Sequence, residues 1–267
     1  MTDEQNLLDE YQKYNAHGDK KNYFISVVND FNVYDKYITN NKYVNCKNNV
    51  LIAFDSIKEG KTIPELYNYK VDGWFIFCHQ DWEILEDITP ILEKLDKKNI
   101  YGTVGSKSIY YNKKIMKVLR GFCYEEKKDG TQKRALGKLE SIPQIVDTLD
   151  CQVIIMHSFL VNKYNLRFDE NLDWHLYVED FSINAKLKYD INSYAYSINC
   201  CHHSNSGYTQ NIPNDYYKCL KYMNKKYPKN IFAGTVSYIG GKDFQEASKI
   251  DIIKYIRENK NAKKDFG

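Results

Sequence analysis

Asp81 is the side chain best placed for metal chemistry in this sequence. It follows the apolar run in residues 74–82 (WFIFCHQDW), which is typical of a buried strand that ends in a polar turn. A carboxylate at such a turn can bind a hard divalent cation, and the cation can hold a diphosphate. The structural alternative is that Asp81 only caps a helix that begins near Trp82.

Apolar runs in the first half of the chain predict the strands that would position this residue. They alternate with segments long enough for helices at 30–47, 63–69 and 84–97, the last with apolar residues at helical spacing. This alternation predicts an open, doubly wound α/β sheet. The predicted strands are residues 23–29, 49–55, 73–79 and 100–104.

The second half of the chain is predicted to continue the domain that contains this α/β sheet. Residues 120–138 are charged and contain three glycines, which favours a loop or a hairpin. We expect a main domain at 1–210 and a helical extension at 211–267 that packs on it. The other predicted elements are strands at 150–161 and 193–199 and a helix at 180–188.

Polar residues stand at the ends of the predicted strands, where open α/β sheets bind ligands. These residues are Asn29, Asp30, Asp55 and 79–81. The motifs GxGxxG and GxxxxGK[ST] are absent from the sequence positions that would need them, so neither the NAD site nor a P-loop is supported.

Composition indicates a globular, cytoplasmic protein. The chain is 43% hydrophobic and 27% charged, and 38 basic against 35 acidic residues give a formal charge of +3. This near balance argues against a nucleic-acid binder. No run approaches the roughly 18 apolar residues of a membrane span, and we expect the seven cysteines to be reduced.

Three segments carry a family resemblance. Residues 77–81 (FCHQD) resemble the F-x-H-Q-D form of the DxD motif in the glycosyltransferase family 2-like group of bacterial GT-A enzymes. Residues 168–180 contain FDE and then HLYVED, and residues 202–204 read HHS, in the order and spacing of that group's later signature. The group's usual proline-x-tyrosine-asparagine is replaced by VND at 28–30, and Cys151 stands where the group has a glycine.

The resemblance implies a GT-A fold, a Rossmann-like nucleotide-diphospho-sugar transferase architecture with an open mixed sheet flanked by helices. It further implies a UDP-linked or similarly activated sugar donor and transfer with inversion. The cofactor would be Mn²⁺ or Mg²⁺. We expect Asp81 to bind this ion, with His203 or His202 as a second ligand, since imidazole suits Mn²⁺. Gln80 and His79 belong to the same motif, and His79 is expected to be structural or a donor to phosphate.

An inverting transfer needs one base to take the proton of the acceptor hydroxyl. Asp180, at the start of a predicted helix, is the preferred base, and Glu179 is the alternative. The structural explanation of this pair is that acidic residues are favoured at a helix N-terminus.

The remaining candidate site residues concern the nucleotide and the sugar. Asp55 matches the acidic residue by which the family contacts the nucleoside, although it could be only a cap. Asn29, Asp30 and Asn68 would lie close to it. Three rings could stack on a sugar, namely those of Trp82, Trp174 and His175.

Two other functions fit the sequence less well. A nucleotidyltransferase needs a glycine- and lysine-rich stretch after the first strand, which residues 23–35 lack. A degenerate GT-A domain that binds a glycan or a partner is expected to have lost a carboxylate, but Asp55, Asp81, Glu179 and Asp180 are all present. The acceptor would be a glycan, a lipid-linked molecule or a protein, and the lysine-bearing residues 243–267 could contact an anionic membrane.

Overall fold

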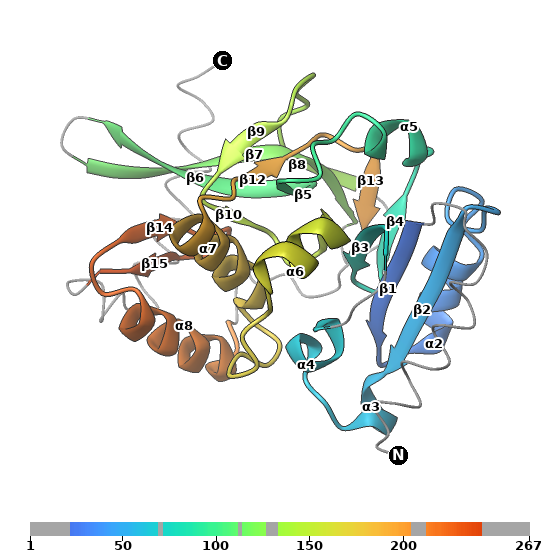
Figure 1. Ribbon diagram of the computed structural model, residues 1–267, viewed down its shortest axis with the longest axis horizontal. Coiled ribbons are helices and arrows are strands. Elements are labelled where there is room, and N and C mark those ends of the chain that lie inside the picture. The colour runs from blue at the N-terminus through green and yellow to red at the C-terminus, as the bar shows by residue number, and fades with distance from the viewer. Residues whose placement is uncertain (1–21, 69–71, 112–113, 127–132, 204–211, 242–267) are drawn as a thin grey trace.

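Three parallel strands form the part of the sheet that carries the predicted site. The computed structural model describes residues 22–68, 72–111, 114–126, 133–203 and 212–241. β1 (Asn22–Val28) pairs in parallel with β2 (Asn49–Asp55) on one side and with β3 (Trp74–Cys78) on the other. Every residue of β1 and β3 is buried, as expected for strands covered on both faces. Figure 1 shows β1 and β2 at the right-hand side of the molecule.

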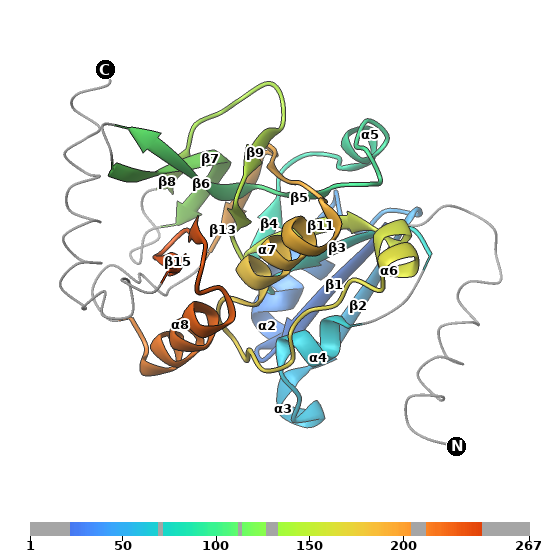
Figure 2. The same ribbon diagram turned by 60° about the vertical axis from the view of Figure 1, so that its left-hand side comes forward.

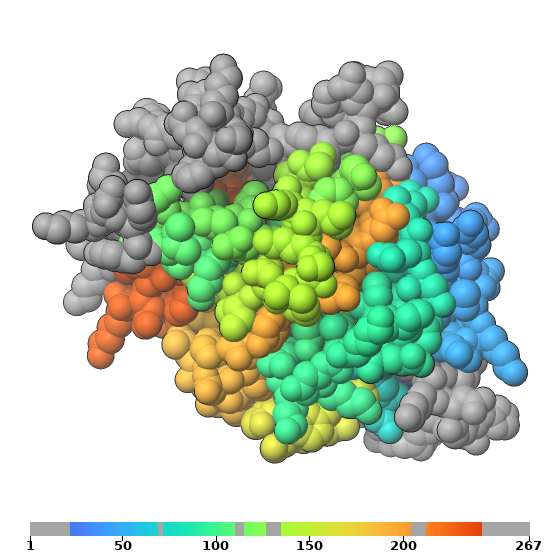
Figure 3. Space-filling view, turned by 90° about the horizontal axis from the view of Figure 1, so that it is seen from above, coloured from blue at the N-terminus to red at the C-terminus, as the bar shows by residue number. Residues whose placement is uncertain are grey.

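The remaining strands make this sheet mixed. β11 (Val153–His157) runs antiparallel to β3 and pairs on its other side with β5 (Ile100–Gly102). β12 (Ser193–Ala195) is parallel to β5, and β9 (Gln144–Val146) is antiparallel to β12. Figure 3 shows the surface of the molecule from above, with the first described strands, in blue, at its right-hand side. The order is β2-β1-β3-β11-β5-β12-β9. The predicted open mixed α/β sheet is therefore confirmed.

A second sheet joins the site to the C-terminal part of the domain. Its order is β10-β6-β7-β13-β4, with β8 paired to β7. The charged segment predicted as a loop or hairpin is the β7–β8 hairpin, whose connection at 127–132 lies outside the described residues. The strands are β4 (Trp82–Ile84), β6 (Val104–Tyr111), β7 (Lys114–Glu126), β8 (Lys133–Gly137), β10 (Thr148–Leu149) and β13 (Cys200–His202).

Helices flank the sheets. In both Figure 1 and Figure 2, α7 lies between the β6–β7 ribbon above and α8 below. The predicted helix at 30–47 is shorter than expected, because a short α-helix passes into a π-helix that ends at Thr39. The helices are α2 (Phe31–Tyr34), η1 (Asp35–Thr39), α3 (Ser56–Glu59), α4 (Ile63–Tyr67), α5 (Thr89–Leu92), α6 (Ser158–Tyr164), α7 (Tyr177–Tyr189) and α8 (Asn214–Lys226).

The helix predicted at 84–97 is wrong over most of its length. Ile84 belongs to β4 and pairs with Cys200 of β13, so only the four residues of α5 are α-helical in this segment. The apolar residues that suggested a helix are nevertheless buried at Ile84, Ile88 and Leu92. The apolar spacing therefore indicated correctly which residues are buried. The backbone conformation was decided by the pairing of β4 with the distant strand β13.

The C-terminal extension is only partly helical. After α8 the chain forms an antiparallel hairpin of β14 (Ile231–Ala233) and β15 (Tyr238–Gly240). The proposed boundary at residue 210 and the predicted tail after 242 lie outside the described residues.

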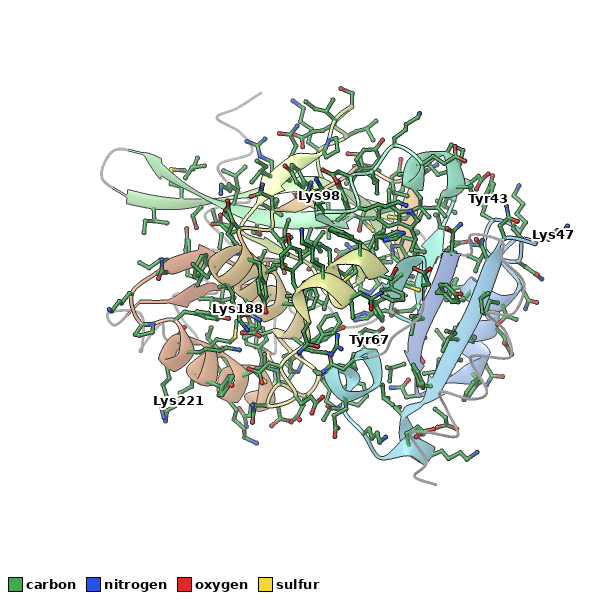
Figure 4. All side chains as sticks on the ribbon, in the orientation of Figure 1. Tyr43, Lys47, Tyr67, Lys98, Lys188 and Lys221 are labelled. Atoms are coloured by element: carbon green, nitrogen blue, oxygen red, sulfur yellow. The ribbon has the colours of Figure 1, made fainter. Side chains whose placement is uncertain are left out.

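Two apolar cores cover the two faces of the parallel strands. Alternate residues of β1, such as Ile25 and Phe24, belong to different cores, as the two-residue repeat of a strand requires. Tyr67 of α4 belongs to the first core, whereas Lys47 and Lys221 lie at the periphery (Figure 4). The strand ends that carry the predicted site are thus held by packing on both sides.

Candidate active site

The turn of His79, Gln80 and Asp81 joins β3 to β4. β4 then pairs with β13, so that His202 stands opposite Trp82. The backbone N–H of His203 donates to the carbonyl of Asp81 at 2.9 Å. This strand pairing brings the C-terminal histidines to the turn, and Asp81 does not cap a helix because β4 follows it.

Three of these side chains form a cluster that could hold a metal ion. One ligand atom from each of His79, Asp81 and His202 lies within 4.8 Å of the other two. His202 Nε2 is 3.3 Å from Asp81 Oδ1, yet it is buried and makes no hydrogen bond of acceptable geometry. A buried ring nitrogen without a hydrogen-bond partner beside a carboxylate fits a cation between them. The sequence predicted as ligands Asp81 and one histidine of the 202–203 pair. Asp81 and His202 do lie together.

The side chains of His79, Asp81 and His202 affect one another's pKa values. Burial opposes the charge of Asp81, but contact with His202 and the charges of both histidines outweigh it and lower the pKa of Asp81 to about 2. Burial likewise opposes protonation of His202, but Asp81 and Asp150 bring its pKa above the ordinary value. Burial lowers the pKa of His79. Asp81 is therefore a carboxylate at neutral pH.

His203 lies outside this cluster. Its Nε2 is 2.8 Å from Glu83 Oε2, its Nδ1 contacts Glu126 Oε2, and its ring stacks on Tyr37 with centroids 3.8 Å apart. Because both ring nitrogens are engaged by carboxylates, His203 is a poor candidate for a metal ligand. Of the two alternatives, the geometry favours His202.

Glu179 is a buried carboxylate at the start of α7. Its side chain is on the first turn of α7, the residue is 4% exposed, and Oε2 has no hydrogen-bond partner among the described residues. Burial, and then the charge of Asp150, raises the pKa of Glu179 to about 8. Burial raises the pKa of the Cys151 thiol, and the charges of Asp150, Glu179 and Asp81 raise it further. Sequence reasoning missed Asp150 as a site residue, although it stands at the start of the apolar segment 150–161.

Asp180 points into a different environment. Its Oδ1 accepts a hydrogen bond from Tyr227 Oη at 2.7 Å and lies 2.8 Å from Lys226 Nζ, and both partners belong to the C-terminal end of α8. Asp180 was the preferred base and Glu179 the alternative, and these contacts favour the reverse assignment.

Gln80 and Asn29 bind each other. Gln80 Oε1 accepts from the backbone N–H groups of Asn29 at 2.9 Å and Asp30 at 3.1 Å, and its Nε2 donates to Asn29 Oδ1 at 2.7 Å. These bonds fix the turn after β1 against the turn after β3. Both residues lie at the predicted edge of the sheet, and their contacts give them a structural function there.

The other predicted donor residues also have structural partners. Asp30 and Asp55 cap α2 and α3 through Oδ1, as the cap alternative for Asp55 expects. Asn68 donates to the Phe168 carbonyl and to Glu170, and accepts from Phe168 N–H. Asn68 therefore binds the FDE segment.

The three predicted stacking rings differ in exposure. Trp82 is fully buried in the second core, so it cannot stack on a sugar. Trp174 is 45% exposed, and His175 packs edge-on against Tyr216. Only Trp174 presents a large open ring surface.

The predicted membrane-contacting segment lies outside the described residues. Within the described part of the chain, no helix has both the length and the apolar character required of a transmembrane span.

Comparisons with known proteins are sparse. No family model matches the chain, and no curated protein matches it. Among solved structures, the chain is similar to residues 1–349 of TarS from S. aureus, with 12% sequence identity and a TM-score of 0.45 over 89% of this chain and 70% of that one.

Proposed function

We propose that this chain is an inverting glycosyltransferase that moves a sugar from a nucleotide-diphosphate donor to an acceptor hydroxyl. The observation that carries the proposal is the cluster of Asp81, His202 and His79, together with a buried Glu179 whose Oε2 has no hydrogen-bond partner among the described residues. Its place at the carboxyl end of a parallel strand is where open α/β sheets bind ligands. The motif resemblance in residues 77–81 points to the same activity.

Asp81 and His202 would hold the divalent ion. Their ligand atoms approach each other through the pairing of β4 with β13, and the ionised state of Asp81 supports cation binding. A bound divalent ion would neutralise the diphosphate that leaves the sugar. Partial burial of the cluster lowers the local dielectric constant and strengthens this interaction.

Glu179 would be the general base. Because burial and Asp150 raise its pKa to about 8, its carboxylate has the proton affinity that transfer near neutral pH needs. Asp180, held by Lys226 and Tyr227, would fix the first turn of α7 and thereby the direction of the Glu179 side chain.

The donor is proposed to be a UDP-sugar, with its nucleoside at the edge formed by Asn29, Asp30 and Asp55. The acceptor would be a glycan, a lipid-linked molecule or a protein in surface polysaccharide or glycoconjugate synthesis at the cytoplasmic side of a membrane. Acceptor pockets are formed by variable loops, so the acceptor class is left open.

Release of nucleoside diphosphate from a panel of UDP-, GDP- and dTDP-sugars, with Mn²⁺ present, tests the proposal. We expect one donor to be turned over by the native chain and not by Asp81→Asn, and the same donor to raise the melting temperature. A folded protein that hydrolyses or transfers none of these sugars, but binds a glycan, would instead support the degenerate binding module.

A further inference from the structure

Tyr177 contacts the cluster but has no part in the function proposed so far. It belongs to the HLYVED segment, is fully buried, and its Oη lies 3.2 Å from His79 Nε2. The same hydroxyl donates a hydrogen bond to the Cys151 carbonyl at 3.4 Å. Tyr177 thus connects the first residue of α7 to the turn that carries Asp81.

This pair of contacts is compatible with the tautomer that a metal-binding His79 needs. A tyrosine hydroxyl has one proton, and when it donates that proton to the Cys151 carbonyl, its oxygen accepts from Nε2–H of the imidazole. A neutral ring protonated at Nε2 has its free lone pair at Nδ1. Nδ1 is therefore the nitrogen of His79 that can bind a cation.

His79 is also held in place by its backbone. Its N–H donates to the Gln152 carbonyl at 3.0 Å, and its ring centroid is 5.6 Å from that of His202. Metal-binding histidines usually donate their other N–H to an oxygen that sets the ring orientation. Tyr177 has the position and the hydrogen-bonding direction of such a partner.

From these contacts we infer that His79 is a third ligand of the ion, through Nδ1, and that Tyr177 is the residue that positions it. This inference rests on the proposed function, because it completes the ligand set of the same site. The set then consists of two imidazole nitrogens and one carboxylate oxygen. Such a set favours first-row transition metal ions, whereas Mg²⁺ prefers oxygen ligands throughout. The site therefore selects Mn²⁺ over Mg²⁺, the two ions that the sequence left as alternatives.

Metal titrations without any nucleotide sugar test this inference. Protein freed of metal is titrated with Mn²⁺, with free Mn²⁺ followed by electron paramagnetic resonance, and with Mg²⁺ by calorimetry. We expect Mn²⁺ to bind at least about 10-fold more tightly than Mg²⁺ and electron spin-echo modulation to show two imidazole nitrogens on bound Mn²⁺. Equal affinity for the two ions, or one imidazole only, overturns the inference.

Tyr177→Phe tests the positioning residue. Loss of a partner in the outer shell of a metal site typically weakens binding by about 10- to 100-fold, and we expect that loss for Mn²⁺ here. Tyr101→Phe is the matched control, because it removes another buried hydroxyl whose bonds are to Asp96. Unchanged Mn²⁺ affinity in a folded Tyr177→Phe protein contradicts the positioning role.

A second pair of variants tests the ligand atom if Tyr177→Phe does not fold. The amide of Asn reaches about as far as Nδ1 of histidine, whereas the longer Gln reaches toward Nε2. His79→Asn should therefore retain more Mn²⁺ affinity than His79→Gln, and the opposite order rejects Nδ1. Selective Mn²⁺ binding by a protein that transfers no sugar would keep this inference and reject the proposed function. Sugar transfer that is unchanged by substitution of His79 would keep the proposed function and reject this inference.

Discussion

Lys226 Nζ lies 2.8 Å from Asp180 Oδ1, which fastens the C-terminal end of α8 to the first turn of α7. The same ammonium group is 2.5 Å from Asp169 Oδ2, and Tyr222 donates to that oxygen at 2.7 Å. Asp169 belongs to the FDE segment, so one lysine joins two of the segments on which the family resemblance rests. The C-terminal extension is thereby coupled to the helix that carries Glu179.

Lys226→Met should destabilise the protein by about 3 kcal/mol, because it leaves the buried Asp180 without its cationic partner. Urea denaturation measures the difference. Lys225→Met, on the exposed side of the same helical turn, is the control and should change stability by less than about 0.5 kcal/mol. Equal effects of the two substitutions would show that the pairing contributes nothing specific.

Glu179→Gln should reduce kcat for the donor identified by the panel by about 10²- to 10⁴-fold, because it removes the proposed general base while keeping the size of the side chain. Donor affinity, measured by calorimetry, should change little. Asp180→Asn is the comparison, since it keeps the Tyr227 contact in part and should mainly lower stability. A kcat loss confined to Asp180→Asn would restore the assignment that the sequence favoured.

The stability of the native chain should fall as pH rises from about 5 to 8, relative to Glu179→Gln. In the folded state the pKa of Glu179 is about 8, above the value of about 4.3 expected when unfolded. The folded state then binds the extra proton between these values, so its stabilisation is full below the lower pKa and is lost through the upper one. Thermal unfolding of both proteins from pH 4 to 9 measures this difference in stability. If the melting temperatures of the two proteins change in parallel with pH, the raised pKa of Glu179 is contradicted.

The parallel strands were predictable because each is a continuous apolar run, and β1, β2 and β3 begin and end within one residue of the predicted bounds. The segment after Asp81 was not predictable in the same way. Its apolar spacing suits a helix, but β4 forms by pairing with β13, more than a hundred residues away in sequence. Local periodicity contains no information about such a partner.

In the candidate site, too, some features follow from the local sequence and others depend on contacts between distant segments. The sequence identified Asp81 and a histidine of the 202–203 pair from residue type and position, but only strand register distinguishes His202 from His203. Adjacent residues of an α-helix point about 100° apart, so Glu179 and Asp180 face different surroundings. Which one binds Lys226 and Tyr227 depends on where α8 packs, which no local pattern of α7 indicates.

Gln80→Leu should release the turn after β1. The substitution removes the acceptor for the N–H groups of Asn29 and Asp30, at a cost of about 1 kcal/mol in stability. Amide hydrogen exchange, followed by NMR, should accelerate at those two residues and remain unchanged in the centre of β1. Gln144→Leu, whose side chain bonds only a local carbonyl at Ile142, is the control. Continued protection of both amides would show that Gln80 does not hold the turn.

His203 and Glu83 should be energetically coupled, because Nε2 and Oε2 are 2.8 Å apart and the histidine side chain is 7% exposed. A double-mutant cycle of His203→Ala and Glu83→Gln, measured by urea denaturation, should give an interaction energy of about 1–2 kcal/mol. The same cycle with Glu93→Gln, on a residue after α5, should be additive within about 0.5 kcal/mol. Additivity in both cycles would mean that Glu83 does not hold the His203 ring. In that case the contact of Nε2 with Glu83 would no longer help to explain why His202, and not His203, faces Asp81.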